Sequence, residues 1–157
     1  MIEALIGMVL VALLVLSTAG LQVSSLQFQR SAGNRFLAVA LAGELGESLE
    51  ANQTGALAGN YALAAVSAPV TASTDCSQAY CTPAQLSRWD LAQWTTRVAA
   101  TIPVKDMSVQ SGTSPSGLVT YTIRISWIEP KGRQTYDDGV SSETLSFVLT
   151  KVVRNVG

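Results

Sequence analysis

Few side chains in this 157-residue sequence could carry out chemistry. The chain has no histidine, which removes the commonest general base and the commonest metal ligand together. It has no serine in a nucleophile-elbow setting, no phosphate-cradling glycine loop and no carboxylate pair whose spacing suggests acid–base work. Asp90 is expected to form local hydrogen bonds, and Asp137-Asp138 is interpreted as a turn rather than a calcium site. We therefore predict no catalytic residue, no metal ligand and no cofactor.

Glu3 is the one charge in a long apolar run at the N-terminus. From Ala4 to Val23 only three residues are polar, and twenty helical residues at about 1.5 Å each span roughly 30 Å, the thickness of a bilayer's hydrocarbon core. A carboxylate at the head of such a segment lacks hydration and must find a partner. We predict that residues 1–25 form a transmembrane or filament-core helix in which Glu3 contacts a second chain. A cleaved secretory signal is the alternative, but no basic residue precedes the run.

Cys76 and Cys81 are the only cysteines, and they lie close together in a polar segment. In a membrane-anchored domain such a pair indicates a disulfide formed in an oxidising compartment. Two free thiols are the alternative, whereas a zinc site would need two carboxylates as further ligands. Arg30 and Arg35 follow the apolar run and would hold that side in the cytoplasm. The cysteines indicate the opposite orientation, with the same side in an oxidising compartment. The two indications agree if a basic leader once preceded Met1.

Composition limits the classes of partner. The net charge is −1 and no basic cluster occurs, so nucleic-acid binding has no electrostatic support. Residues 26–157 suffice for one small domain, and the 48% of hydrophobic residues fits a membrane helix plus a modest core.

The first helix is expected to continue to about Asn52, with residues 26–52 as an amphipathic half. The polar sequence from Asn52 to Gly55 ends it, and we interpret this sequence as a helix end rather than a glycosylation sequon. The apolar positions of this half recur at three- and four-residue spacing: Phe36, Leu37, Ala40, Leu41, Ala42, Leu45 and Leu49.

A connection over residues 53–82 is expected to be loop with room for one helical turn. A second helix over 83–101 has a strong start signal, because Thr82 can cap it, Pro83 suits its first position and Gln85 completes a capping box. Ile102-Pro103 ends this helix. Its apolar face is Leu91, Trp94 and Val98, widened by Leu86 and Trp89, and we expect the tryptophans to be core residues.

From Val104 onward the apolar period changes to two, which is typical of half-buried strands. A short strand contains Met107 and Val109, and a third strand contains Leu145, Phe147 and Leu149 and ends near Val153. The cleanest alternation lies between them, at Val119, Tyr121, Ile123, Ile125 and Trp127. We therefore predict an α+β fold in which the second half of a long helix packs on a three- to four-stranded antiparallel sheet over residues 104–157, with a short second helix.

An apolar helix headed by a lone glutamate and followed by a small αβ head resembles the type IV pilins and the related pseudopilins. The residues from Met1 to Ile6 resemble the cleavage-proximal sequence of that superfamily. The resemblance is closer still to the PilV minor pilins, the type IV pilus modification proteins, and covers nearly the whole chain. It is carried by Glu50-Ala51-Asn52, Ala58-Gly59-Asn60-Tyr61, Cys81-Thr82-Pro83-Ala84-Gln85-Leu86, Asp90-Leu91-Ala92-Gln93-Trp94, Ile102-Pro103 and Tyr121-Thr122-Ile123-Arg124-Ile125-Ser126-Trp127.

The resemblance implies a role for Glu3: it would pair with the N-terminal amine of a neighbouring subunit. In the family a prepilin peptidase cuts after a glycine, the new N-terminal residue is methylated, and the glutamate is then fifth. Here it is third, so we expect two mature residues and the basic leader to be absent from this sequence.

The resemblance further implies a minor pilin that helps prime assembly and sits at or near the tip of a pilus used in adhesion and twitching motility. Its partners would be other minor and major pilins and a large tip adhesin. It would lie in the bacterial inner membrane with its head in the periplasm before assembly, and in the extracellular pilus afterwards. A minor pseudopilin of type II secretion is the alternative, and a membrane-tethered periplasmic enzyme or binding module is a remote one.

Overall fold

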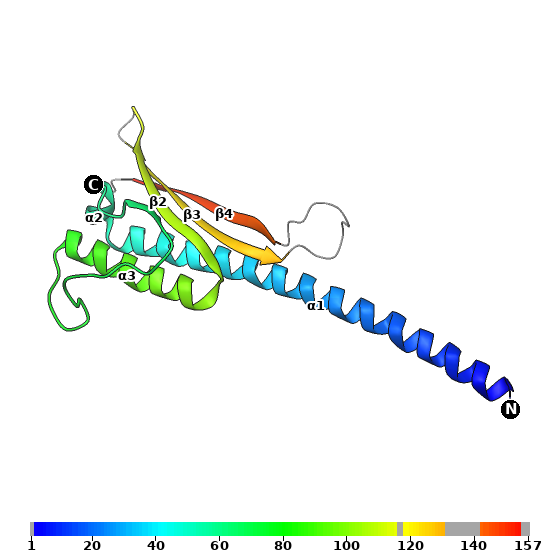
Figure 1. The fold of residues 1–157 in the computed structure, drawn as a ribbon. Coiled ribbons are helices and arrows are strands. Elements are labelled where there is room, and N and C mark those ends of the chain that lie inside the picture. Colours follow the sequence, from blue (N-terminus) through cyan, green and yellow to red (C-terminus); the bar gives the residue numbers. More distant parts are fainter. Residues whose placement is uncertain (1, 116–117, 131–141, 155–157) are drawn as a thin grey trace.

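The computed structural model describes residues 2–115, 118–130 and 142–154, with their side chains except those of 19–21, 23, 24 and 130. A long helix projects from a small head in which two shorter helices and a sheet are combined (Figure 1). This is the α+β, pilin-like architecture predicted from the sequence. In chain order the elements are α1 (Ile2–Ala51), α2 (Gln53–Leu57), β1 (Leu63–Val66), α3 (Pro83–Thr101), β2 (Val104–Thr113), β3 (Val119–Pro130) and β4 (Ser142–Val153).

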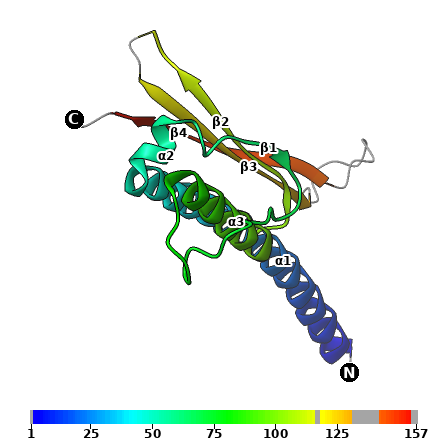
Figure 2. The same cartoon turned by 90° about the vertical axis from the view of Figure 1, so that its left-hand side faces the viewer.

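Helix α1 runs without interruption from Ile2 to Ala51, one residue short of the predicted end. Its first half extends away from the head, and its second half lies beside α3 beneath the sheet (Figures 1 and 2). Within the described part of the chain, no helix combines the length and apolar character needed to cross a membrane.

The sheet is antiparallel, with the strand order β1-β2-β3-β4. Ile123 lies at its centre, opposite Val109 on β2 and Leu149 on β4. Strand β1 falls in the segment predicted to be a loop, so that prediction is wrong for residues 63–66. The segment Leu-Ala-Ala-Val is too short to show an alternating pattern by itself, and its pairing with β2 comes from the tertiary fold.

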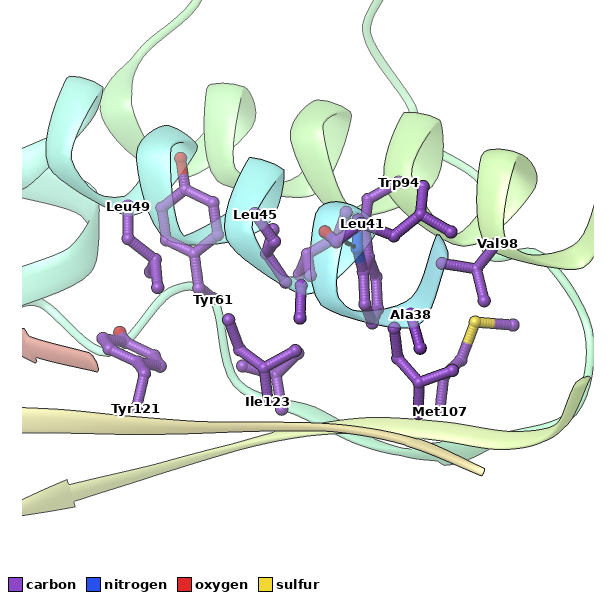
Figure 3. Close-up of a cluster of buried hydrophobic side chains, with 14 of the residues drawn as sticks. Ala38, Leu41, Leu45, Leu49, Tyr61, Trp94, Val98, Met107, Tyr121 and Ile123 are labelled. Atoms are coloured by element: carbon purple, nitrogen blue, oxygen red, sulfur yellow. Dashed lines mark hydrogen bonds between the residues drawn. The ribbon is translucent and has the colours of Figure 1, made fainter. Parts of the chain in front are cut away.

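The second half of α1 buries one stripe against the sheet and α3 (Figure 3). The buried positions of this stripe are Ala38, Leu41, Ala42, Leu45 and Leu49, each at most 8% exposed. Two residues predicted for the apolar face do not belong to it, since Ala40 is exposed and Phe36 is 72% exposed. Apolar type and spacing cannot distinguish a residue on the core face from one that is a third of a turn away.

Most of the other predicted core positions are confirmed, but Trp89 and Leu86 are only partly buried and lie outside the core cluster, so the prediction is wrong for these two residues. All five alternating residues of β3 are buried, as are the helical residues Leu91, Trp94 and Val98. Helix α3 begins with the predicted capping box, in which Thr82 and Gln85 exchange side-chain-to-backbone hydrogen bonds, and it ends before Ile102. The predicted turn at Asp137-Asp138 lies outside the described residues.

Candidate assembly surface

The first half of α1 has no intramolecular partner among the described residues. Every side chain described from Ile2 to Arg30 is exposed, and the large apolar ones from Ile2 to Leu16 are 55–72% exposed. An apolar surface of this extent far exceeds what a monomeric soluble protein presents to water. It must be covered by lipid or by other chains.

Glu3 lies in the first turn of this exposed helix. A carboxylate is favourable there because the first backbone N–H groups of a helix carry partial positive charge and have no acceptor within the helix. The position also leaves the carboxylate open to a cation from another molecule. The N-terminus of α1 lies at the end of the helix remote from the head (Figure 1), and the contact of Glu3 with a second chain stays a prediction.

A buried carboxylate, Glu129 at the end of β3, fastens α1 to the sheet close to the point where the helix leaves the head. It is 7% exposed and accepts hydrogen bonds from Trp127 Nε1 at 2.6 Å and Asn34 Nδ2 at 3.4 Å. Burial alone would raise the pKa of Glu129, but hydrogen bonds from Trp127, Ser31 and Asn34 and the nearby charge of Arg35 outweigh it and lower the pKa.

Glu129 was missed by the sequence analysis. Its position in the alternating pattern could have indicated burial. Glu129 lies two residues beyond Trp127, so it continues the series of β3 side chains that face the core. An acidic residue at such a position is usually paired, because an isolated buried carboxylate is costly.

A buried polar cluster holds the other end of the helix. Asn52 Nδ2 lies 2.8 Å from the carbonyl oxygen of Pro83, 3.1 Å from Ser87 Oγ and 3.2 Å from the Tyr61 hydroxyl. Its Oδ1 accepts the backbone N–H of Gly55 at 3.2 Å and so caps α2. Because these contacts occupy the amide and only 6% of Asn52 is exposed, the structure supports the interpretation of this sequence as a polar helix end.

Asp90 belongs to the same cluster and accepts a hydrogen bond from the Tyr61 hydroxyl. Burial raises the pKa of Asp90 and outweighs the opposing effects of that hydrogen bond and of Arg97. Burial and the adjacent carboxylate also raise the pKa of Tyr61. The carboxylate therefore forms a local structural contact, as the sequence analysis expected.

Three further contacts tie α1 to its neighbours. The indole N–H of Trp94 donates to the carbonyl oxygen of Leu41 at 2.9 Å. Arg97 of α3 forms a salt bridge with Glu44, and Lys151 of β4 forms one with Glu50, 2.5 Å between Nζ and Oε1. The head is consequently attached to α1 along the whole buried stripe, whereas the first half of the helix stays exposed.

The predicted disulfide between Cys76 and Cys81 is present. It closes a short loop immediately before the cap of α3, and Asp75, the residue that precedes this loop, accepts the backbone N–H of Ser77 at 2.9 Å. This loop belongs to the connection that precedes α3, at the end of the molecule remote from the N-terminus (Figure 1). The structure therefore does not bring the two predicted sites together: Glu3 marks one end and the disulfide stabilises the other.

Residues 20–92 match a family model described as Tt1218-like, type IV pilin Tt1218. This segment, 73 of the 157 residues, is similar to the type IV pilin family. The matched segment covers most of α1 and the polar cluster that joins it to α3. No curated protein and no solved structure matches the chain significantly.

Proposed function

We propose that this protein is a type IV pilin, a structural subunit rather than an enzyme, and that the likeness of residues 20–92 to that family supports this assignment. More narrowly, we propose a minor subunit of the PilV kind that enters the filament of a type IV pilus through the first half of α1. The observation that carries the proposal is the contrast within that one helix. Its described side chains up to Arg30 are all exposed and mostly apolar, whereas its second half is buried in a well-packed head. A surface with these properties fits a neighbouring helix of the same kind.

Glu3 supplies the specific contact in this proposal. As the helix leaves lipid for the filament core, its carboxylate pairs with the N-terminal amine of a neighbouring subunit. In an apolar setting each partner depends on the other, because removing one leaves a buried charge unpaired at a cost of about 3–5 kcal/mol. The pair therefore favours the correctly seated neighbour and disfavours misplaced ones.

The proposed subunit occupies two locations, one before assembly and one after it. Before assembly the subunit lies in the bacterial inner membrane with its head in the periplasm, which is consistent with a disulfide in the head. Afterwards it helps prime assembly and sits at or near the tip of the extracellular pilus, among other minor and major pilins and a large adhesin. The resemblance to PilV supports these finer assignments.

The proposal is tested by replacing Glu3 with alanine in cells and recovering sheared surface filaments. We expect the Glu3→Ala subunit to be made and folded, with its disulfide intact, and to be strongly depleted from filaments. Glu47→Ala is the matched control, because Glu47 is an exposed acid on the same helix within the head, and this variant should be incorporated normally.

Normal incorporation of Glu3→Ala would refute the role of the carboxylate. Absence of the unmodified chain from purified pili would refute the pilus assignment, and a secretion defect in the same cells would then favour the pseudopilin alternative.

A further inference from the structure

The two edges of the sheet differ greatly. Strand β1 has four residues and pairs irregularly with β2, so the edge it offers is short. Strand β4 has twelve residues, from Ser142 to Val153, and is the last strand in the order, paired only with β3 among the described strands. A long edge of this kind presents a row of backbone N–H and C=O groups ready to pair with another strand.

The side chains along this edge are suited to an amphipathic strand. Leu145, Phe147 and Leu149 point to the α1 face and are only partly buried. The same side of α1 contributes further apolar surface: a Cβ at Gly46 would lie 3.8 Å from the Leu149 side chain, and Val39, two turns earlier on that side, is 50% exposed. An added strand with apolar residues at alternate positions would cover both surfaces.

Two charges mark the ends of the edge. Glu143 near the start of β4 is exposed, and Lys151 near its end is partly exposed beside Glu50. They are the only charged residues of β4. Each lies an even number of positions from Leu145, Phe147 and Leu149, so both project on the same α1-facing side of the sheet as these apolar residues. A strand paired to this edge therefore meets an acid at one end and a base at the other, which fixes its direction and register.

We propose that the β4 edge binds an extended segment of another protein, which adds to the sheet as an antiparallel strand. The segment has apolar residues at alternate positions, a basic residue opposite Glu143 and an acidic residue opposite Lys151. A second copy of this subunit paired through the same edge is disfavoured, because the two-fold axis of that pairing would point the two α1 helices in opposite directions. This exclusion rests on the proposed function, since subunits of one filament share a direction.

The sequence of β4 itself has the required pattern when it is read antiparallel. With Phe147 opposite its own counterpart, Lys151 of the added strand faces Glu143 of the protein, and Glu143 of the added strand faces Lys151. A fluorescent synthetic peptide with the sequence of residues 142–153 is therefore the probe, and the full chain in detergent micelles is the receptor.

The test is a charge-reversal cycle read by fluorescence anisotropy. Glu143→Lys in the protein places two lysines opposite each other and should weaken binding of the peptide about fivefold. The peptide carrying Lys151→Glu should bind the unmodified protein equally weakly and should recover its affinity on the Glu143→Lys protein. Glu47→Lys, which makes the same change of charge on α1, should leave the affinity of the original peptide unchanged.

Absence of binding would overturn the proposal. It would also be overturned if the peptide with Lys151→Glu did not recover its affinity on the Glu143→Lys protein, because the two charges would then not face each other. Binding that survives N-methylation of alternate peptide backbone nitrogens, in both possible phases, would overturn it too, because strand addition requires those N–H groups. Neither result depends on filament incorporation, so a failure here is distinguishable from a failure of the Glu3 experiment.

Discussion

Asn52 Nδ2 and Ser87 Oγ lie 3.1 Å apart, and this contact joins the end of α1 to the start of α3 across 35 positions of the sequence. The same amide reaches the Pro83 carbonyl oxygen and the Tyr61 hydroxyl. One side chain thus connects α1, α2, α3 and the segment that leads to β1. The head depends on this cluster to hold its helices in place beneath the sheet.

Replacing Asn52 with alanine should lower the free energy of unfolding by about 2–3 kcal/mol, because it leaves buried donors and acceptors of the cluster without partners. The measurement is chemical denaturation followed by tryptophan fluorescence. Asn60→Ala, at a partly exposed position of the following turn, is the control and should change stability far less. Equal stability of the two variants would show that the cluster does not hold the helices together.

Gly55→Ala should be destabilising for a different reason. A Cβ at this position would lie 2.5 Å from Asn52 Nδ2 and Ser87 Oγ and 2.8 Å from the Pro83 carbonyl oxygen, so the cluster would have to move. At Gly43 an added Cβ meets nothing within 4 Å, and Gly43→Ala should stabilise α1 by about 1 kcal/mol. Thermal melts of the two variants in parallel should shift in opposite directions, and a shift of both in one direction would contradict the packing described here.

Removing the disulfide by Cys76→Ser with Cys81→Ser should lower the free energy of unfolding by about 2 kcal/mol, the value expected from loop-closure entropy for so short a loop. Assembly should survive, because the loop lies remote from α1's exposed half. Mass spectrometry of the unreduced protein checks the bond, and denaturation of both forms checks the magnitude. Unchanged stability would indicate that the loop is ordered by other contacts, such as the Asx turn at Asp75.

The pH dependence of stability should show the raised pKa of Asp90. Its ordinary value is 3.8 and burial raises it in the folded protein. Between the two values the native state binds more protons than the unfolded state, so this contribution to stability is complete below 3.8 and is lost as pH rises through the folded pKa. Asp90→Asn keeps an acceptor for Tyr61 and should remove this decline in a series of denaturation curves. A decline identical in both proteins would assign it to another group.

Glu129 should have the opposite effect. Its pKa is lowered from an ordinary value of 4.5, chiefly because hydrogen bonds to the carboxylate outweigh its burial. Its contribution is therefore present above 4.5 and is lost as pH falls through the folded pKa. Glu129→Gln should weaken the attachment of α1 at Asn34 and flatten the acid limb of the stability curve. Hydrogen exchange of the α1 amides near Asn34 would show the loosening directly, and unchanged protection would contradict it.

Much of this protein followed from local sequence signals. Uninterrupted apolar spacing predicted α1, the capping box at Thr82 and Gln85 predicted the start of α3, and strict alternation from Val119 to Trp127 predicted β3. The disulfide followed from two nearby cysteines. These features are recognisable because each depends on residues close together in the chain, so that spacing alone expresses the physical requirement.

Only the tertiary structure determined the rest. Strand β1 exists because β2 offers it an edge, and Phe36 is exposed because α3 and the sheet together select which stripe of α1 is covered. The Asn52 cluster and the Glu129 contact each join residues dozens of positions apart, whose types give no sign of their partners. Apart from β1, the sequence determined which segments are helix and strand, because backbone preferences are local. Which polar groups become buried together was decided by packing, which brings distant segments into contact.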